Sequence, residues 1–199
     1  MDEVYLENRE FDHQKSAAKL LRDWVLVILM ALGAAMMVRV FILQQFYISG
    51  PSMEMTLLEN DRVLVNKLSY RLHAIRRGDV VVFDRVTTNG GVVAHDDLIK
   101  RVIGIENDTV EIQKCKVLVN GQVIDEPYLD KDMLALPSLE EVCRIVDMKK
   151  TTVPKDQVFV MGDNRAQSFD SRSFGTIPED LVIGRAFAIV WPFGNIRGL

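Results

Sequence analysis

The feature that most constrains this chain is a long apolar run near its N-terminus. Trp24–Val38 reads WVLVILMALGAAMMV without a charge, Arg39 interrupts the run, and Val40–Leu43 continues it. A helix of about 20 residues spans the hydrocarbon core of a bilayer, and an arginine near its end can extend its charge to the interface. The run therefore predicts one transmembrane helix over residues 23–43.

Two other interpretations of the run were weighed against a membrane anchor. A secretory signal peptide with its apolar region at 24–38 would carry a long, mixed-charge N-terminal region, and no clean small-x-small cleavage site precedes Gln44 and Gln45. A buried core helix would have to be apolar on all sides, which a domain of this size rarely accommodates. We therefore favour the spanning anchor.

Positive charges beside the run predict its orientation. Lys15, Lys19 and Arg22 precede it closely, and cytoplasmic flanks carry an excess of Lys and Arg. We expect residues 1–22 to form a cytoplasmic N-terminus and residues 44–199 an extracytoplasmic domain. The protein would then be a single-pass protein of the cell membrane, with membrane lipid as one partner.

Downstream of the run the pattern changes to short β-branched segments bounded by turn residues. Such segments occur at 62–70, 78–86, 99–105, 108–113, 116–124, 157–162 and 184–191. Asn120-Gly121 lies between two apolar stretches, which is a strong hairpin signal. The expected fold class is mostly β, an antiparallel β-sheet domain that follows one N-terminal transmembrane helix. Residues 129–150 differ and predict an insertion, with helical spacing of apolar residues over 136–148.

Composition and missing motifs exclude several function classes. The formal net charge of −4 gives no electrostatic reason to expect nucleic acid as a partner. The chain has no HExxH, zinc-ligand spacing, P-loop or GxGxxG, so we expect no metal and no cofactor. Cys115 and Cys143 are too few for a disulfide framework. Two unpaired cysteines are the favoured interpretation, ahead of a single bridge.

Ser52 is the first candidate for chemistry. It follows Gly50 and Pro51, a step that breaks regular structure and presents what comes next. A triad of Ser52 with His95 and a neighbouring Asp is conceivable, although scattered histidines in polar stretches are usually solvated. Ser52 is therefore either a turn residue beyond the membrane or a nucleophile.

Lys100 offers a different base for Ser52. In LIKRVIG, Leu98, Lys100 and Val102 share one face of a strand, while Arg101 lies on the other. A desolvated lysine loses its proton more easily and can then act as a base, whereas an arginine stays charged. The spacing permits a Ser–Lys dyad, but the residues alone favour an edge-strand lysine with its ammonium in water.

The segment 161–175, MGDNRAQSFDSRSFG, concentrates polar residues between two apolar strands. Paired Asp and Arg side chains in such a loop can form a fixed charge network. Ser168 or Ser171 could orient a neutral lysine amine. A plain surface loop is the alternative interpretation.

Taken together, SGPSMEMTL, GDVVVF, IKRVIG with DTVEI, and VFVMGDNRAQSFDSRSFG resemble the bacterial type I signal peptidases, also called leader peptidases. The resemblance runs from about residue 22 to 191 and preserves the order of the motifs, and the single span suits the smaller Gram-positive type. It implies an all-β domain, with Ser52 as nucleophile and Lys100 as general base. It further implies that Ser168 orients the lysine and that Met53 helps to form the substrate cleft. Asp163, Asp170, Arg172 and Arg101 match the structural charge network of the family, with their pairings left open.

Three positions depart from the family pattern. Met55 stands where proline is usual, and Glu106-Asn107 stand where Pro-Gly is usual. Gly50 replaces a serine that helps to form the oxyanion hole in some members, so we expect the hole to rest on backbone N–H groups, chiefly that of Ser52. A second donor is left unassigned.

The resemblance implies a membrane-anchored serine endopeptidase that removes signal peptides from exported preproteins with small residues before the cut. The secretion translocon is a candidate neighbour of such an enzyme. Ser52 lies nine residues past Leu43, so the chain can carry it at most about 30 Å from the span. The main alternative is a catalytically inactive, membrane-tethered β domain that binds exported proteins. The apolar segment 189–193 either rests on the bilayer interface or ends the last core strand.

Overall fold

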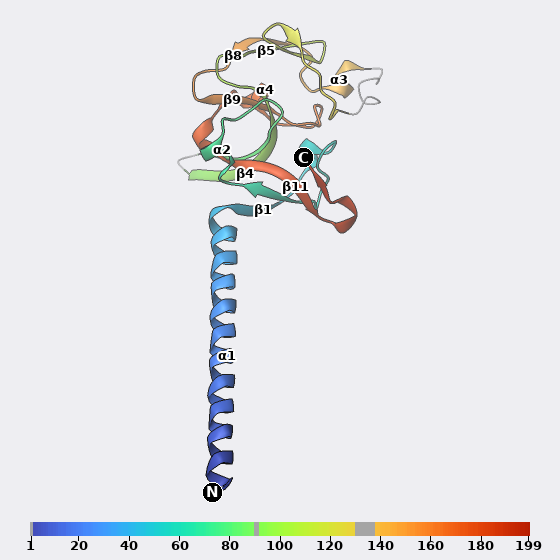
Figure 1. Ribbon diagram of the computed structural model, residues 1–199. Helices are drawn as coiled ribbons and strands as arrows, with labels where there is room; N and C mark the ends of the chain where they lie inside the picture. The colour runs from blue at the N-terminus through green and yellow to red at the C-terminus, as the bar shows by residue number, and fades with distance from the viewer. Residues whose placement is uncertain (1, 90–91, 130–137) are drawn as a thin grey trace. The chain divides into compact units, whose positions relative to one another are not determined.

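The computed structural model describes residues 2–89, 92–129 and 138–199. The chain separates into two compact units, with the boundary between Ile42 and Leu43. The first unit is one long helix, α1 (Asp2–Phe41), in which Lys19–Arg39 is long and apolar enough to cross a membrane. The predicted helix over 23–43 extends too far, because Leu43 already pairs with Asn66 as the first residue of strand β1 (Figure 1).

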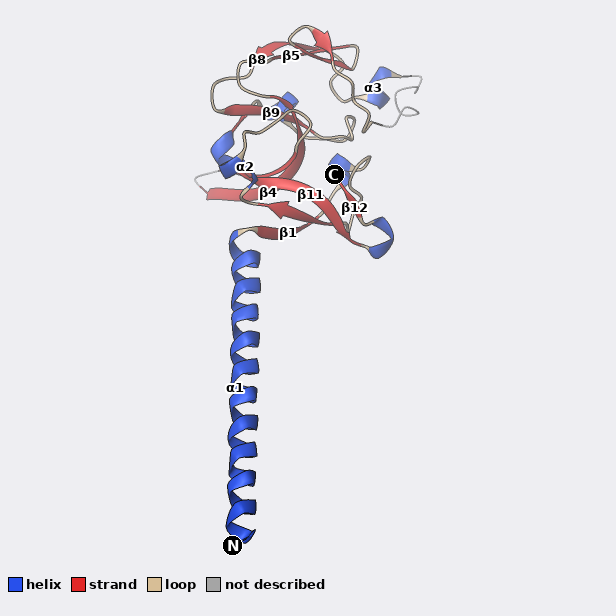
Figure 2. Cartoon of the chain, viewed as in Figure 1, coloured by secondary structure: helices blue, strands red, loops and turns tan. Residues whose placement is uncertain are grey.

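The second unit is mostly β, as expected, and all strand pairings described are antiparallel (Figure 2). Its larger sheet has the order β1-β2-β11-β3-β4-β9-β10, with β12 beside β11. The strands are β1 (Leu43–Tyr47), β2 (Arg62–Asn66), β11 (Val182–Trp191), β3 (Val80–Asn89), β4 (Val92–Gly104), β9 (Gln157–Met161), β10 (Ile177–Pro178) and β12 (Arg197–Gly198). Buried residues alternate along β2, whereas Val80–Phe83 of β3 and Val158–Met161 of β9 are buried at every position, as expected of strands covered on both faces.

A smaller sheet has the order β7-β6-β5-β8. It contains β7 (Gln122–Val123), β6 (Lys116–Val119), β5 (Thr109–Gln113) and β8 (Met148–Thr152). The predicted hairpin at Asn120-Gly121 is confirmed, since these residues join β6 to β7 with φ of 54° and 79°. Two positive φ angles at the turn match the twist of the flanking strands.

Short helical turns lie between the strands. They are α2 (Ser69–Leu72), α3 (Leu139–Val142), α4 (Ser171–Phe174), and the 3₁₀ turns η1 (Pro51–Met53), η3 (Glu179–Leu181) and η4 (Phe193–Asn195). The predicted helix over 136–148 is wrong beyond Val142, and residues 136–137 lie outside the described part of the chain. At Met148 the chain enters strand β8 and is no longer helical, because Met148 pairs with Ile112 of β5.

The preference for two unpaired cysteines is also wrong. Cys115 and Cys143 form a disulfide, with their Cα atoms 5.8 Å apart. Because 28 residues separate the two cysteines, no local sequence pattern indicates that they are in contact. Cys143 follows α3 directly, so the disulfide fixes the end of the 129–150 insertion against the turn between β5 and β6.

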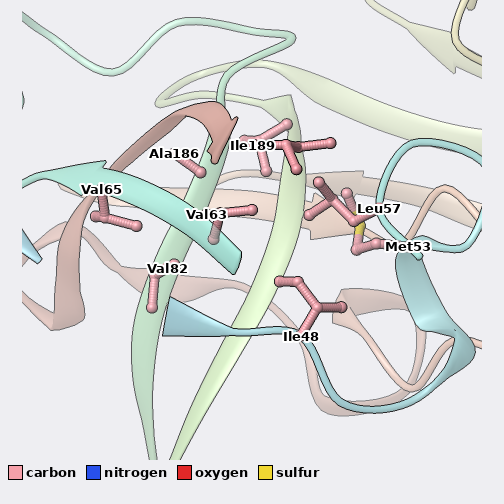
Figure 3. Close-up of a cluster of buried hydrophobic side chains, with 9 residues drawn as sticks. Ile48, Met53, Leu57, Val63, Val65, Val82, Ala186 and Ile189 are labelled. Carbon is pink, nitrogen blue, oxygen red and sulfur yellow. The ribbon is translucent and has the colours of Figure 1, made fainter. Parts of the chain in front are cut away.

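Three hydrophobic clusters stabilise the second unit. The first joins β2, β3 and β11 to the segment around Ser52; it contains Ile48, Met53, Leu57, Val63, Val65, Val80, Val82, Ala186 and Ile189 (Figure 3). The second lies under the smaller sheet, and the third packs Phe83 and its neighbours between β3, β4 and β9. Burying one such side chain contributes about 1.5–3 kcal/mol, so the first cluster anchors the Ser52 turn firmly.

Candidate active site

The Ser52 turn is held in place by its apolar neighbours. Gly50 has φ 87° and ψ 163°, a conformation that favours glycine, and Pro51–Met53 then form one 3₁₀ turn. Met53 is 1% exposed and points into the first cluster with Leu57 and Ile48 (Figure 3). The turn thus presents Ser52 while its neighbour is buried. Met53 is not among the residues that line the pocket described below, so its expected contribution to the substrate cleft stays a prediction.

Lys100 lies on β4 beside Ser52. Its Nζ donates to Ser52 Oγ at 2.9 Å and to the carbonyl oxygen of Ile99 at 2.8 Å. Lys100 is only 3% exposed, so the interpretation of an ammonium in water is wrong. Strands β3 and β9 pair with the two edges of β4, so β4 is an interior strand of the sheet and the edge-strand assumption is wrong.

Burial sets the protonation of this amine. Desolvation lowers the pKa of Lys100 to about 8, although the negative charges of Asp170 and Asp163 act in the opposite direction. Near neutral pH, a lysine with this pKa is unprotonated in part of the molecules, and only the unprotonated amine can act as a base. At 2.9 Å, the neutral amine can accept the proton of the Ser52 hydroxyl.

The charge network has two buried ion pairs. Arg101 binds Asp163 in a bidentate manner, with Nε–Oδ1 at 2.9 Å and Nη2–Oδ2 at 2.7 Å. Arg172 binds Asp170 in the same manner, with both contacts at 2.8 Å. Burial acts to raise the pKa of Asp170, but the Arg172 guanidinium and further hydrogen bonds keep it below its ordinary value. Asp170 is thus a fixed anion.

These ion pairs fix the loop that supports Ser52. The Asn164 N–H donates to the Ser52 carbonyl at 3.1 Å, and the Gly162 N–H donates to Asp170 at 2.9 Å. A Cβ at Gly162 would lie 2.4 Å from the Ser52 carbonyl oxygen and 2.3 Å from Ser168 Oγ. Only glycine allows this approach. Sequence reasoning did not single out Gly162 and Asn164 as site residues, although both lie in the GDNR motif.

Further polar contacts that sequence reasoning missed surround the network. Thr56 Oγ1 donates to Asp163 Oδ2 at 2.5 Å and accepts from Arg101. Arg165 is buried and pairs with Glu126, a residue far away in sequence. A lone Thr or Glu gives no sequence signal of such a role.

Ser168 is buried close to these groups. Its hydroxyl contributes to the lowered pKa of Asp170, yet Oγ makes no hydrogen bond of standard geometry with any described residue. In particular, no hydrogen bond joins it to Lys100 in the described part of the chain. The expected orienting role of Ser168 therefore stays a prediction.

A pocket of about 100 Å³ opens beside the dyad. Its walls are the segment Phe46–Ser49, Val82 of β3, and the β4 segment Asp97–Lys100, with Ser52 at one end. His95 lies five residues before Lys100 on β4 and pairs with Asp84 at 2.6 Å. The structure therefore brings Lys100, and not His95, to Ser52. Among the described residues, no group of three metal-ligating side chains is suited to a metal ion.

Comparisons with known proteins show which family the chain belongs to. A family profile described as "Signal peptidase, peptidase S26" matches residues 21–191. "Probable signal peptidase I-2" of Synechocystis sp. is 36% identical over 96% of this chain and 80% of its own length. "Signal peptidase IB" of Staphylococcus aureus is 34% identical over 90% of this chain and 94% of its own length.

A solved structure of a signal peptidase I from Enterococcus faecalis is also similar. It is 28% identical and covers 57% of this chain and 97% of the solved chain, with a TM-score of 0.44. The family profile spans the Ser52 turn, β4 and the GDNR loop together. With two curated relatives at 34–36% identity over most of its length, the chain belongs to the signal peptidase I family, peptidase S26.

Proposed function

We propose that this protein is a membrane-anchored serine endopeptidase that removes N-terminal signal peptides from exported preproteins with a Ser52–Lys100 dyad. The observation that carries the proposal is the 2.9 Å contact between Lys100 Nζ and Ser52 Oγ in a site where Lys100 is almost fully buried. A hydroxyl beside a desolvated amine is an activated nucleophile. Membership of the signal peptidase family supports the substrate class.

The chemistry is acyl transfer. Neutral Lys100 takes the proton of the Ser52 hydroxyl while Oγ attacks the scissile carbonyl carbon. The backbone N–H of Ser52 stabilises the resulting oxyanion, and protonated Lys100 then gives its proton to the leaving amine. Water, activated by the same lysine, hydrolyses the acyl-enzyme and restores Ser52.

Substrate specificity follows from the pocket beside the dyad. Its two long walls are extended segments, residues 46–49 and 97–100, that an extended peptide can line up with. A volume of about 100 Å³ accommodates small side chains and excludes large ones. We therefore expect small residues at the first and third positions before the cut.

Two observations support anchoring and orientation. Lys19–Arg39 is long and apolar enough to cross a bilayer, and Lys19 and Arg22 precede its apolar part. The disulfide between Cys115 and Cys143 suits an oxidising compartment. Residues 44–199 would therefore lie on the extracytoplasmic side, where preproteins emerge.

Cleavage of a preprotein by the full-length protein in detergent tests the proposal. We expect the wild-type protein to cut after a small residue. In Ser52→Ala and Lys100→Ala, kcat/KM should fall by a factor of about 10³ or more. Lys149→Ala, an exposed lysine on β8, is the matched control and should retain activity. If Lys100→Ala still cuts and His95→Ala does not, the dyad is wrong. If wild type binds preproteins but cuts none, the inactive binding domain is correct instead.

A further inference from the structure

The most basic stretch of the chain has no role in the chemistry above. Residues 62–78 contain no Asp or Glu, although the whole chain has a net charge of −4. Their cations are Arg62, Lys67, Arg71, Arg76 and Arg77. Arg77 pairs with Asp108, whereas Arg71 and Arg76 are exposed and no described residue makes an ion pair with either. Two guanidinium groups are thus directed to solvent beside the short helix α2.

A pocket of about 360 Å³ lies at the same place. Arg76, Arg185, His73, Tyr70, Ser69 and Asn66 line it, and Asp79 is the one carboxylate among its lining residues. Asp79 accepts from the Tyr70 hydroxyl at 3.2 Å and pairs with Arg185 Nε at 3.1 Å.

Asp79 orients the Arg185 guanidinium through its contact with Nε but leaves much of the side chain in solvent. The side chain of Arg185 remains 45% exposed, and no described residue binds its terminal nitrogens. A fixed guanidinium with free N–H groups is a good ligand for a phosphate oxygen. Ser69 and Asn66 add neutral hydrogen-bonding groups to the same pocket.

Strand register locates this pocket relative to the chain's entry into the β domain. Leu43 pairs with Asn66, and Asn66 pairs with Arg185. Paired Cα atoms are about 5 Å apart, so Arg185 lies about 10 Å from Leu43. Two further residues lead back to Phe41, which adds at most about 8 Å. The pocket is therefore within about 18 Å of the end of the apolar helix, whatever direction that helix takes.

Leu72 places an exposed apolar side chain beside these basic residues. It is 72% exposed and adjoins Arg71 on α2. An exposed leucine between basic residues suits the boundary between headgroups and acyl chains, because the leucine enters the apolar layer while the cations contact phosphates. A soluble protein partner or a free anion would not need this combination.

We propose that the 66–76 segment and Arg185 form a binding site for the phosphodiester headgroups of anionic phospholipids in the extracytoplasmic leaflet. This inference rests on the membrane anchoring proposed above. Arg76 and Arg185 contact the phosphate, Arg71 adds long-range attraction, and Leu72 enters the interface. A second attachment point near β1 would limit rotation of the β domain about the anchor.

Amide hydrogen exchange of the full-length protein in lipid nanodiscs tests the site. We compare nanodiscs of phosphatidylcholine alone with nanodiscs in which one third of the lipid is phosphatidylglycerol. Amides of residues 67–78 should exchange at least about fivefold more slowly with phosphatidylglycerol, because each basic residue near an anionic surface contributes about that factor in affinity. Half-molar salt should remove the difference.

Variants separate this site from general charge effects. Arg71→Gln/Arg76→Gln should reduce the exchange ratio to near one, and Arg71→Lys/Arg76→Lys should retain much of it. Lys149→Gln/Lys150→Gln, on exposed β8 residues, changes the net charge equally and should leave the ratio unaltered. Preprotein cleavage in detergent is measured in parallel and reports on the dyad alone.

The outcomes are distinguishable. Equal exchange in the two kinds of nanodisc would overturn the lipid site even if cleavage were normal. Protection by millimolar glycerol phosphate in phosphatidylcholine nanodiscs, equal to that by phosphatidylglycerol, would assign the pocket to a soluble phosphate instead. Failure of the protein to remain in nanodiscs would overturn the anchor and this inference together, whatever the peptidase activity in detergent.

Discussion

The pH dependence of cleavage tests the buried lysine most directly. Lys100 has an ordinary pKa of 10.5, which desolvation lowers to about 8. At pH 7 the neutral fraction is then about one in ten, against roughly one in 3,000 for an ordinary lysine. Burial therefore increases the concentration of the neutral Lys100 amine, the form that the proposed mechanism requires, about 300-fold at this pH.

This fraction predicts the shape of the profile. Because kcat/KM reports ionisations of the free enzyme, it should rise about tenfold per pH unit between 6 and 7.5 and level off above about 8. The assay uses a peptide substrate without groups that titrate between pH 6 and 10, and full-length protein in detergent. His95→Asn is the control and should leave the profile unchanged.

Three results would contradict the assignment of Lys100 as the base. A midpoint near 10.5 would mean that the lysine is solvated, and a midpoint near 6.5 that is lost in His95→Asn would identify a histidine base. A profile that is flat from pH 7 to 9 would show that proton transfer to this amine does not limit the reaction.

The same pKa makes a prediction about stability. Between pH 8 and 10.5 the unfolded chain binds more protons than the folded chain, so burial of Lys100 costs stability at neutral pH and the cost declines as pH rises. The difference between 10.5 and about 8 corresponds to about 3 kcal/mol. Lys100→Met should therefore raise the free energy of unfolding at pH 7 by up to about this amount, and by less at pH 10. A destabilised Lys100→Met would contradict the assigned cost.

Three further predictions concern the support of the site. Arg101→Leu leaves a buried carboxylate unpaired and should lower the free energy of unfolding by about 3–5 kcal/mol in denaturant titrations; a loss below 1 kcal/mol would show that the pair is solvated. Gly162→Ala forces a Cβ against the Ser52 carbonyl and should reduce kcat at least about 100-fold, while Gly194→Ala, which has open space, should remain active. Cys143→Ser opens a bridge across 28 residues and should cost about 3 kcal/mol, as should reduction of the wild type; an unchanged melting temperature on reduction would contradict the bridge.

Local patterns predicted much of the fold. The apolar run predicted a long helix, and β-branched segments predicted β2, β3, β4, β5, β6, β9 and β11. These elements have strong periodicity, and local periodicity reflects the burial that each element requires. Failures occurred where pairing with a distant strand decides the conformation. Leu43 was predicted to be helical but belongs to strand β1, and Met148 was predicted to be helical but belongs to strand β8.

In the candidate site too, sequence motifs identified the residues, whereas the structure was needed to show which of them are in contact. Sequence motifs identified Ser52, Lys100 and the acidic and basic residues of the GDNR loop. They did not determine that Arg101 pairs with Asp163 and Arg172 with Asp170, or that Asn164 holds the Ser52 carbonyl. The contacts of Arg101 with Asp163 and of Asn164 with Ser52 join residues 62 and 112 positions apart, so no local pattern encodes them. Arg172 and Asp170 are neighbours in sequence, but several other charged partners were available to each.

Local sequence patterns therefore specify the parts of this protein: one apolar helix, a run of short strands, and candidate residues for a nucleophile and a base. The tertiary structure alone decided which residues meet and in what environment. Lys100 is a candidate base because β4 lies inside the sheet and the packed structure leaves its side chain almost fully buried. A pKa depends on solvation and on neighbouring charges in three dimensions, and these exist only once distant segments have packed together.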